Sequence, residues 1–146
     1  MLKYMIFLPA LLLGQIEKQV RDENPGLFIN QRLYHNPPRP LFKGRAYSLE
    51  FITNVPDDSV LSATLFFKTN FMGFYQEFLL GGSKGLYKFQ YKPDKYPGTH
   101  IQYYFVLTTE NEIYGTPIDD EGQLTPVNKL LIDPSEYFKQ QARLNR

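Results

Sequence analysis

The stretch from Gly98 to Pro117, GTHIQYYFVLTTENEIYGTP, constrains the fold more than any other part of this chain. Its first half alternates in the two-residue period of a strand that buries one face in a core. Glu110-Asn111 then reverses the chain, and Glu112 to Tyr114 pairs back. The stretch therefore predicts a β-hairpin, whose inward side chains are Ile101, Tyr103, Phe105 and Leu107.

Five more segments carry strand patterns, and turn signals separate them. No helical pattern of about ten residues interrupts them, which disfavours a parallel sheet built from alternating strands and helices. Together with the hairpin they predict an all-β fold, a β-sandwich of about seven strands. The segments are Leu27 to Tyr34, Ala46 to Asn54, Val60 to Thr69 (with Leu61, Ala63, Leu65 and Phe67 in one phase), Phe74 to Leu80 and Leu86 to Tyr91.

The composition fits that class and excludes several others. At 146 residues the chain is long enough for one domain with tails, and its hydrophobic fraction of 42% suffices for a packed core. The 12 Phe and 11 Tyr favour strands. The absence of Cys excludes disulfides, thiolate zinc sites and Cys nucleophiles. The net charge of +1 draws the chain neither to nucleic acid nor to an anionic membrane, because both need clustered basic charge.

Residues 1–14, MLKYMIFLPALLLG, have the pattern of a cleavable signal peptide. Lys3 gives a basic start, and the uncharged apolar run that follows is too short to span a bilayer as a helix. Gly14 is a small residue at the cleavage point. The alternatives are a buried strand or an uncleaved anchor. The signal peptide predicts export to a periplasmic, cell-surface or extracellular location.

We expect a division into a signal peptide (1–14), an N-terminal segment (15–32), the sandwich (33–117) and a connector with a C-terminal helix (118–146). Thr125 to Ile132 reads as a last strand or as an extended segment on the domain. Asp133 to Glu136 has the sequence of a helix start, with Asp as N-cap, Pro first and Glu in the first turn. The helix is expected to end near Leu144. It would act as a docking tail, on its own domain or on another chain, through Tyr137, Phe138 and Leu144.

Several landmarks stand in a characteristic order: HNPP from His35, a turn at Gly44, ATLFFKT from Ala63, LYKFQY from Leu86, and the hairpin from Ile101. Over about residues 33–117 they resemble bacterial extracellular modules of the immunoglobulin-like or fibronectin type III-like class. The resemblance implies an immunoglobulin-like sandwich. It also implies that Tyr103 packs inward and hydrogen-bonds the backbone at the sheet corner, while Tyr104 faces out. The Cys pair and core Trp of antibody domains are absent, so an antibody-type domain is not implied.

No motif of catalysis or cofactor binding stands out. His35 and His100 occupy unrelated loop positions, which favours edge packing over a metal or catalytic pair. The acidic clusters Asp57-Asp58 and Asp119 to Glu121 lack the ligand spacing of a calcium loop, which favours solvated turns over calcium sites. Gly81 to Gly85, GGSKG, lacks the spacing of a phosphate loop. We therefore predict no catalytic residue, no cofactor and no metal, and a protein that is not an enzyme.

Outward aromatic side chains are the strongest indication of function. The sequence has more of them than one face of a small sandwich buries, and an exposed aromatic patch needs a reason. Tyr and Phe suit the centre of a protein interface, and they also stack on sugars. The alternatives are a two-sided core or a cover formed by the terminal segments. The candidate partner or glycan surface comprises Phe74, Tyr75, Tyr96, Tyr104 and Tyr114, and Phe66 and Phe71 share its pattern.

These observations predict a non-catalytic exported module that acts structurally or binds a protein in a cell-surface or extracellular assembly. Self-assembly through residues 125–146 is one route. A carbohydrate-binding module that uses surface Tyr and Phe is the first alternative. An unrecognised hydrolase is the second, and a deep pocket with gathered carboxylates would identify it. Neither a membrane span nor a nucleic-acid partner is expected.

Overall fold

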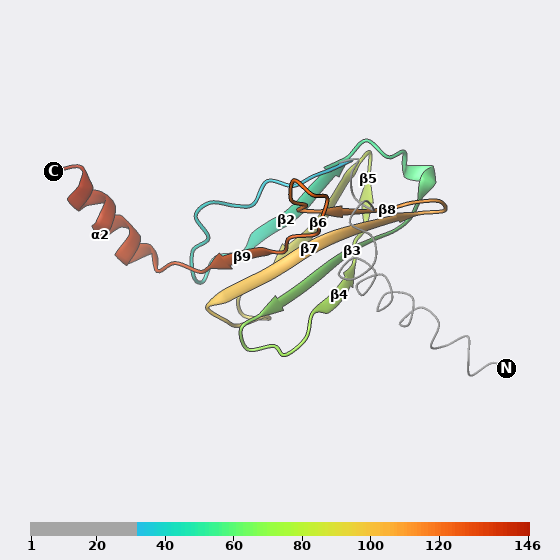
Figure 1. Ribbon diagram of the computed structural model, residues 1–146. Coiled ribbons are helices and arrows are strands. Elements are labelled where there is room, and N and C mark those ends of the chain that lie inside the picture. The colour runs from blue at the N-terminus through green and yellow to red at the C-terminus, as the bar shows by residue number, and fades with distance from the viewer. Residues whose placement is uncertain (1–31) are drawn as a thin grey trace.

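The computed structural model describes residues 32–146, which form two stacked antiparallel β-sheets (Figure 1). The first sheet has the strand order β1-β2-β6-β5, and the second has the order β4-β3-β7-β8, with β9 also paired to β7. The prediction of a mainly β fold is confirmed. The strands of the first sheet are β1 (Leu33–Tyr34), β2 (Tyr47–Thr53), β6 (Leu86–Tyr91) and β5 (Gly82–Ser83); those of the second are β4 (Gln76–Leu79), β3 (Val60–Thr69), β7 (His100–Thr109), β8 (Ile113–Thr116) and β9 (Val127–Leu130).

The hairpin that dominates the sequence lies at the centre of the second sheet. β7 pairs with β3 along nearly its whole length, with β8 along its second half and with β9 along its first half. The turn closes with a hydrogen bond of 2.9 Å from the Thr109 amide to the Glu112 carbonyl. Because both edges of β7 are paired, its backbone donors and acceptors are satisfied inside the sheet. The segment from Thr125 to Ile132 thus contains the last strand of the sheet.

Aromatic rings from both sheets fill the space between them. The Phe51 ring of β2 stacks on Tyr87 at 5.1 Å and lies 5.1 Å from Phe105 of the opposite sheet. Burial of each ring away from water stabilises the folded state by about 1.5–3 kcal/mol. The inward phase predicted for β7 agrees with the structure, since Ile101, Tyr103, Phe105 and Leu107 are inaccessible to solvent.

The start of β3 departs from the predicted phase. The pairing with β7 shifts register between Val60 and Ser62. An extra residue at such an irregularity turns the side chains before it away from their expected face. Leu61, which the alternation places inward with Ala63, is therefore 63% exposed.

The glycine-rich segment 81–85 is part of a tight hairpin. It contains β5, and the Thr53 amide donates to the Gly85 carbonyl at 2.8 Å, which ties the hairpin to β2. Gly85 has φ +78°, and a Cβ there would collide with the Thr53 carbonyl oxygen. The glycine therefore serves a close backbone approach.

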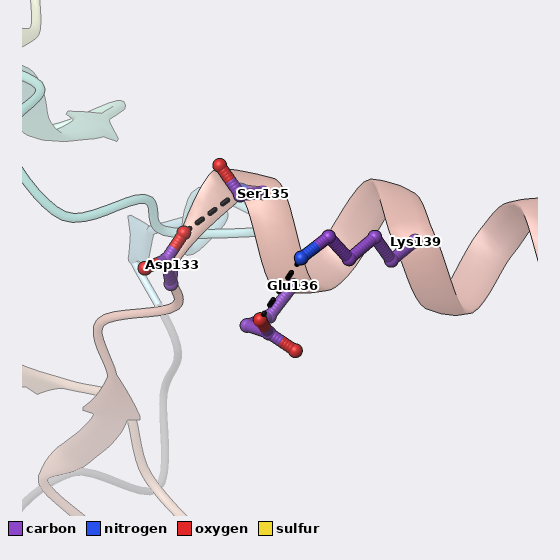
Figure 2. Close-up of polar contacts among 4 residues, drawn as sticks. All are labelled: Asp133, Ser135, Glu136 and Lys139. Atoms are coloured by element: carbon purple, nitrogen blue, oxygen red, sulfur yellow. Dashed lines mark hydrogen bonds and ion pairs between the residues drawn. The ribbon is translucent and has the colours of Figure 1, made fainter.

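The C-terminal helix α2 (Pro134–Leu144) has the predicted start and end. The Asp133 carboxylate accepts a hydrogen bond of 2.8 Å from the Ser135 amide, and Glu136 pairs with Lys139 at 3.6 Å (Figure 2). In Figure 1 the helix extends away from the two sheets. A short parallel contact of Ile132 with Phe42 fastens the chain just before it.

The signal peptide predicted at residues 1–14, and most of the first predicted strand, lie outside the described residues. Within residues 32–146 no helix combines the length and apolar character needed to cross a bilayer.

Candidate functional site

His35 links the two sheets through both nitrogens of its ring. Nδ1 lies 2.6 Å from the Glu50 carbonyl oxygen, and Nε2 lies 2.8 Å from the Tyr103 hydroxyl. A carbonyl can only accept, so Nδ1 carries the proton and the neutral ring accepts the tyrosine hydroxyl at Nε2. The sequence resemblance implied a backbone partner for Tyr103. Its hydroxyl instead reaches the backbone through the imidazole.

Burial sets the ionisation of this pair. It lowers the pKa of His35 below the usual 6.5, although the carbonyl and the charge of Glu50 oppose the shift. Burial also raises the pKa of the Tyr103 hydroxyl. Both groups therefore stay neutral at pH 7, and the pair acts as a structural link. The other histidine, His100, lies exposed at the start of β7 beside Thr99.

The structure sorts the predicted aromatic surface into separate environments. Tyr104 stacks on Phe66 at 4.8 Å, and Tyr75 meets Tyr104 edge-on at 5.2 Å. These rings lie on the outward face of the second sheet, because their neighbours along β3 and β7 face the core. Phe66 and Tyr104 are nearly inaccessible all the same. This outer aromatic cluster comprises Phe66, Tyr75, Tyr104, Val106, Ile113 and Leu124.

Tyr96 and Tyr114 lie elsewhere. The Tyr96 ring packs at the edge of the core, where its centroid lies 5.6 Å from that of Phe67 and 5.5 Å from that of Phe78. Tyr114 faces the core, and its hydroxyl donates to Glu112. Neither joins Tyr104 in a common surface, since both belong to the interior and its margin.

Phe74, the remaining member of the predicted surface, stands at the tip of the loop between β3 and β4. It is 87% exposed, and Phe71 in the same loop is 71% exposed. The base of the loop is fixed, because the Asn70 side-chain oxygen accepts from the amides of Thr99 at 2.8 Å and of His100 at 3.2 Å. The sequence marks Asn70 to Gly73 only as the end of a strand. The structure makes this segment an ordered aromatic projection, here called the aromatic tip (residues 70–75).

Basic side chains gather at the same end of the sandwich. Lys68 lies over the Tyr75 ring at 4.6 Å, and Lys95 lies over the Tyr96 ring at 5.8 Å. A hollow of about 310 Å³ opens beside the tip. Its described lining contains cationic, neutral polar and apolar residues but no acid: Lys68, Thr69, Asn70, Met72, His100, Gln102 and Asn128.

Carboxylates occupy the opposite end. A hollow of about 370 Å³ there is lined by Asp58, Glu110 and Glu112, with Arg32 beside them. The other predicted acidic positions cap turns. Asp57 accepts from the Lys84 and Gly85 amides, and Asp119 accepts from the Glu121 and Gln123 amides. Over residues 32–146 no three potential ligands from His, Cys, Asp and Glu meet in a metal-binding group.

The predicted docking tail has one fixed end. The rings of Tyr137 and Phe138 meet the Phe42 ring at 5.4 and 6.0 Å, and the Arg45 guanidinium lies over Phe42 at 5.4 Å. Beyond this first turn the helix is exposed, and no residue of α2 is buried. Leu144 at its end is 78% exposed.

A scan of protein-family models and a search of curated proteins both find no match to this chain.

Proposed function

We propose that the protein is a non-catalytic, exported module of the immunoglobulin-like class that binds another protein chain through α2. The helix itself carries this proposal. It has 11 residues, none of them buried. An isolated helix of this length is marginal in water, because its stability comes mainly from packing an apolar face. A helix that leaves its own domain after one turn therefore has its packing partner elsewhere.

The strand order supports the immunoglobulin-like class. In such sandwiches the first, second, fifth and fourth strands form one sheet, and the third, sixth and seventh form the other. Here β1, β2, β6 and β5 share a sheet, while β3, β7 and β8 share the second, with β4 added at its edge. Tyr103 then lies on the penultimate strand of the pattern, as the resemblance implies. Because one fold serves many roles, the function has to be argued from the surface.

The surface of α2 fits a second copy of itself. Tyr137, Gln141 and Leu144 recur at the spacing of one helix face, with Phe138 and Ala142 beside them. In an antiparallel pair, Tyr137 of one copy meets Leu144 of the other. Glu136 then lies opposite Arg143, so the charges beside the apolar face are complementary. The same patch serves both copies, as a two-fold interface requires.

Sedimentation equilibrium of the purified full chain tests this proposal. We expect a reversible, concentration-dependent dimer. The double variant Phe138→Ser/Leu144→Ser should stay monomeric at concentrations where the original protein dimerises. Leu79→Ser is the matched control, because Leu79 is equally exposed on β4 and should leave the dimer intact. A protein that stays monomeric throughout, or a dimer that the double variant retains, would contradict the proposal.

Export rests on the sequence of residues 1–14. N-terminal sequencing of protein recovered outside the cytoplasm tests it, with a mature start after Gly14 as the expected result. The carbohydrate-binding alternative has less support. A sugar platform needs exposed ring faces, whereas the Tyr104 ring stacks on Phe66 and is nearly inaccessible.

A further inference from the structure

We propose that the basic end of the sandwich binds an anionic lipid surface, with Phe71 and Phe74 entering the boundary between headgroups and acyl chains. The hollow beside Lys68 would then hold a lipid phosphate. This inference is independent of α2. It rests on three properties of one end of the molecule: exposed aromatic rings, a fixed backbone beneath them, and basic charge around them.

The aromatic tip projects into solvent. Phe71 and Phe74 are among the most exposed large apolar side chains of the described chain. A Cβ added at Gly73, between them, would meet no atom within 4 Å. In Figure 1 the tip is the loop that joins β3 to β4 at the lower edge of the view. Two phenyl rings on an open projection suit insertion into a soft apolar phase, where no shaped groove is required.

Hydrogen bonds hold this projection in place. The Phe71 amide donates to the Thr69 hydroxyl at 3.2 Å, and the Met72 amide donates to the Thr69 carbonyl at 3.1 Å. Asn70 bonds the start of β7 from the same loop. These bonds keep the loop from collapsing onto the sandwich, so the rings stay exposed. Because the loop is already ordered, binding costs little further conformational entropy.

The charges around the tip favour an anionic surface. Residues 68–77 and 92–100 contain three lysines, Lys68, Lys92 and Lys95, against two acids, Glu77 and Asp94. Lysine stems can cover apolar surface while their ammonium groups reach phosphates. The hollow beside Lys68 adds neutral donors from Asn70, Gln102 and Asn128. Such a lining matches a phosphodiester, which offers only acceptors and a negative charge.

The acidic end of the sandwich, opposite the aromatic tip, would orient the protein on an anionic membrane. The loops at residues 54–59 and 110–112 carry four carboxylates, against two cations beside them, Arg32 and Lys84. A negative surface repels that end and attracts the tip, so the separation of charge turns the aromatic rings toward the membrane. The net charge of +1 does not reveal this separation of charge, because the positive charge of one end and the negative charge of the other cancel in the sum.

A single tryptophan reports insertion directly, because the chain contains no Trp. Phe74→Trp and Leu79→Trp each place one indole at an exposed position, the first in the tip and the second on β4. The full chain is mixed with vesicles of phosphatidylglycerol and phosphatidylcholine, and separately with phosphatidylcholine alone. We expect the emission of Phe74→Trp to shift to shorter wavelength with the anionic vesicles only. No shift, or an equal shift for Leu79→Trp, would overturn the proposal.

Co-sedimentation with the same vesicles measures the contribution of each group. Phe71→Ser/Phe74→Ser should lower the bound fraction by about tenfold or more. Lys68→Gln/Lys92→Gln should remove the preference for anionic vesicles, and salt should weaken binding of the original protein. Leu79→Ser is the control, because Leu79 is an exposed apolar residue of β4 outside the tip and outside α2. Equal binding by the tip variant, or equal loss in Leu79→Ser, would contradict the assignment to the tip.

Inorganic phosphate separates the two sources of the anion. If the hollow recognises lipid as part of a surface, phosphate should release the protein no more than chloride of equal ionic strength. Selective release by phosphate, together with an unshifted Phe74→Trp spectrum, would identify a soluble-anion site and overturn the lipid proposal.

Discussion

His35 ties three parts of the chain together, because the segment that carries it touches β2 through Glu50 and β7 through Tyr103. Burial of the ring disfavours its charged form, because an imidazolium loses the water that solvates its charge. The folded protein therefore resists protonation of His35, and its pKa lies below 6.5.

This shift predicts a loss of stability in mild acid. Below pH 6.5 His35 becomes protonated in the unfolded chain while it stays neutral in the folded chain. The contribution of His35 to the free energy of unfolding is therefore fully present above pH 6.5 and falls as the pH drops toward the folded-state pKa. The slope is at most about 1.4 kcal/mol per pH unit, and partial exposure of the ring reduces it. Urea unfolding between pH 7.5 and pH 5, roughly the range in which histidine titrates, measures it. His35→Gln should flatten the curve and His100→Gln should not; identical curves for all three proteins would count against the link.

Gly85 is a second single-residue constraint. Its φ of +78° is strained for any other residue, and a Cβ would collide with the Thr53 carbonyl oxygen. Gly85→Ala should therefore destabilise the fold by about 2 kcal/mol or more. Gly81→Ala is the control, because the space around Gly81 is open. Thermal unfolding compares them, and equal melting temperatures would show that the hairpin can relax around the new methyl group.

At the scale of elements, the sequence predicts what depends on local pattern. The alternation along β7 places Tyr103 inward, and the capping residues place the start of α2 at Pro134. The orientations of Leu61 and Tyr114 could not be predicted from local pattern. Leu61 is displaced by a shift of register between β3 and β7, and Tyr114 faces inward because it pairs with Leu107. Register is decided between strands, so no single segment contains it.

The cap of α2 predicts how the helix responds to mutation. Asp133→Ala removes the acceptor for the Ser135 amide and should cost about 0.5–2 kcal/mol of helix stability. Ser135→Ala is the control, because that contact uses the Ser135 backbone only. Circular dichroism should show less helix for Asp133→Ala and no change for Ser135→Ala. Equal helix content in both variants would mean that the packing on Phe42 fixes the helix without the cap.

At the scale of the whole molecule, the fold creates surfaces that no segment shows alone. Lys68 and Lys95 are 27 positions apart in the sequence, and the contact of Asn70 with Thr99 brings their loops together. The direction of α2 is likewise a property of the complete fold. The sequence shows an amphipathic tail and leaves open whether it packs on its own domain. In the structure only its first turn meets the sandwich, at Phe42.

The central claim is that the exposed face of α2 packs against α2 of a second copy. Because the chain has no cysteine, a single introduced thiol reports that contact. Gln141 lies at the middle of the apolar face and would meet itself across a two-fold axis, whereas Lys139 lies on the opposite side of the helix. Under mild oxidation Gln141→Cys should form a disulfide-linked dimer and Lys139→Cys should not. Equal cross-linking at both positions, or none at Gln141→Cys, would contradict the account.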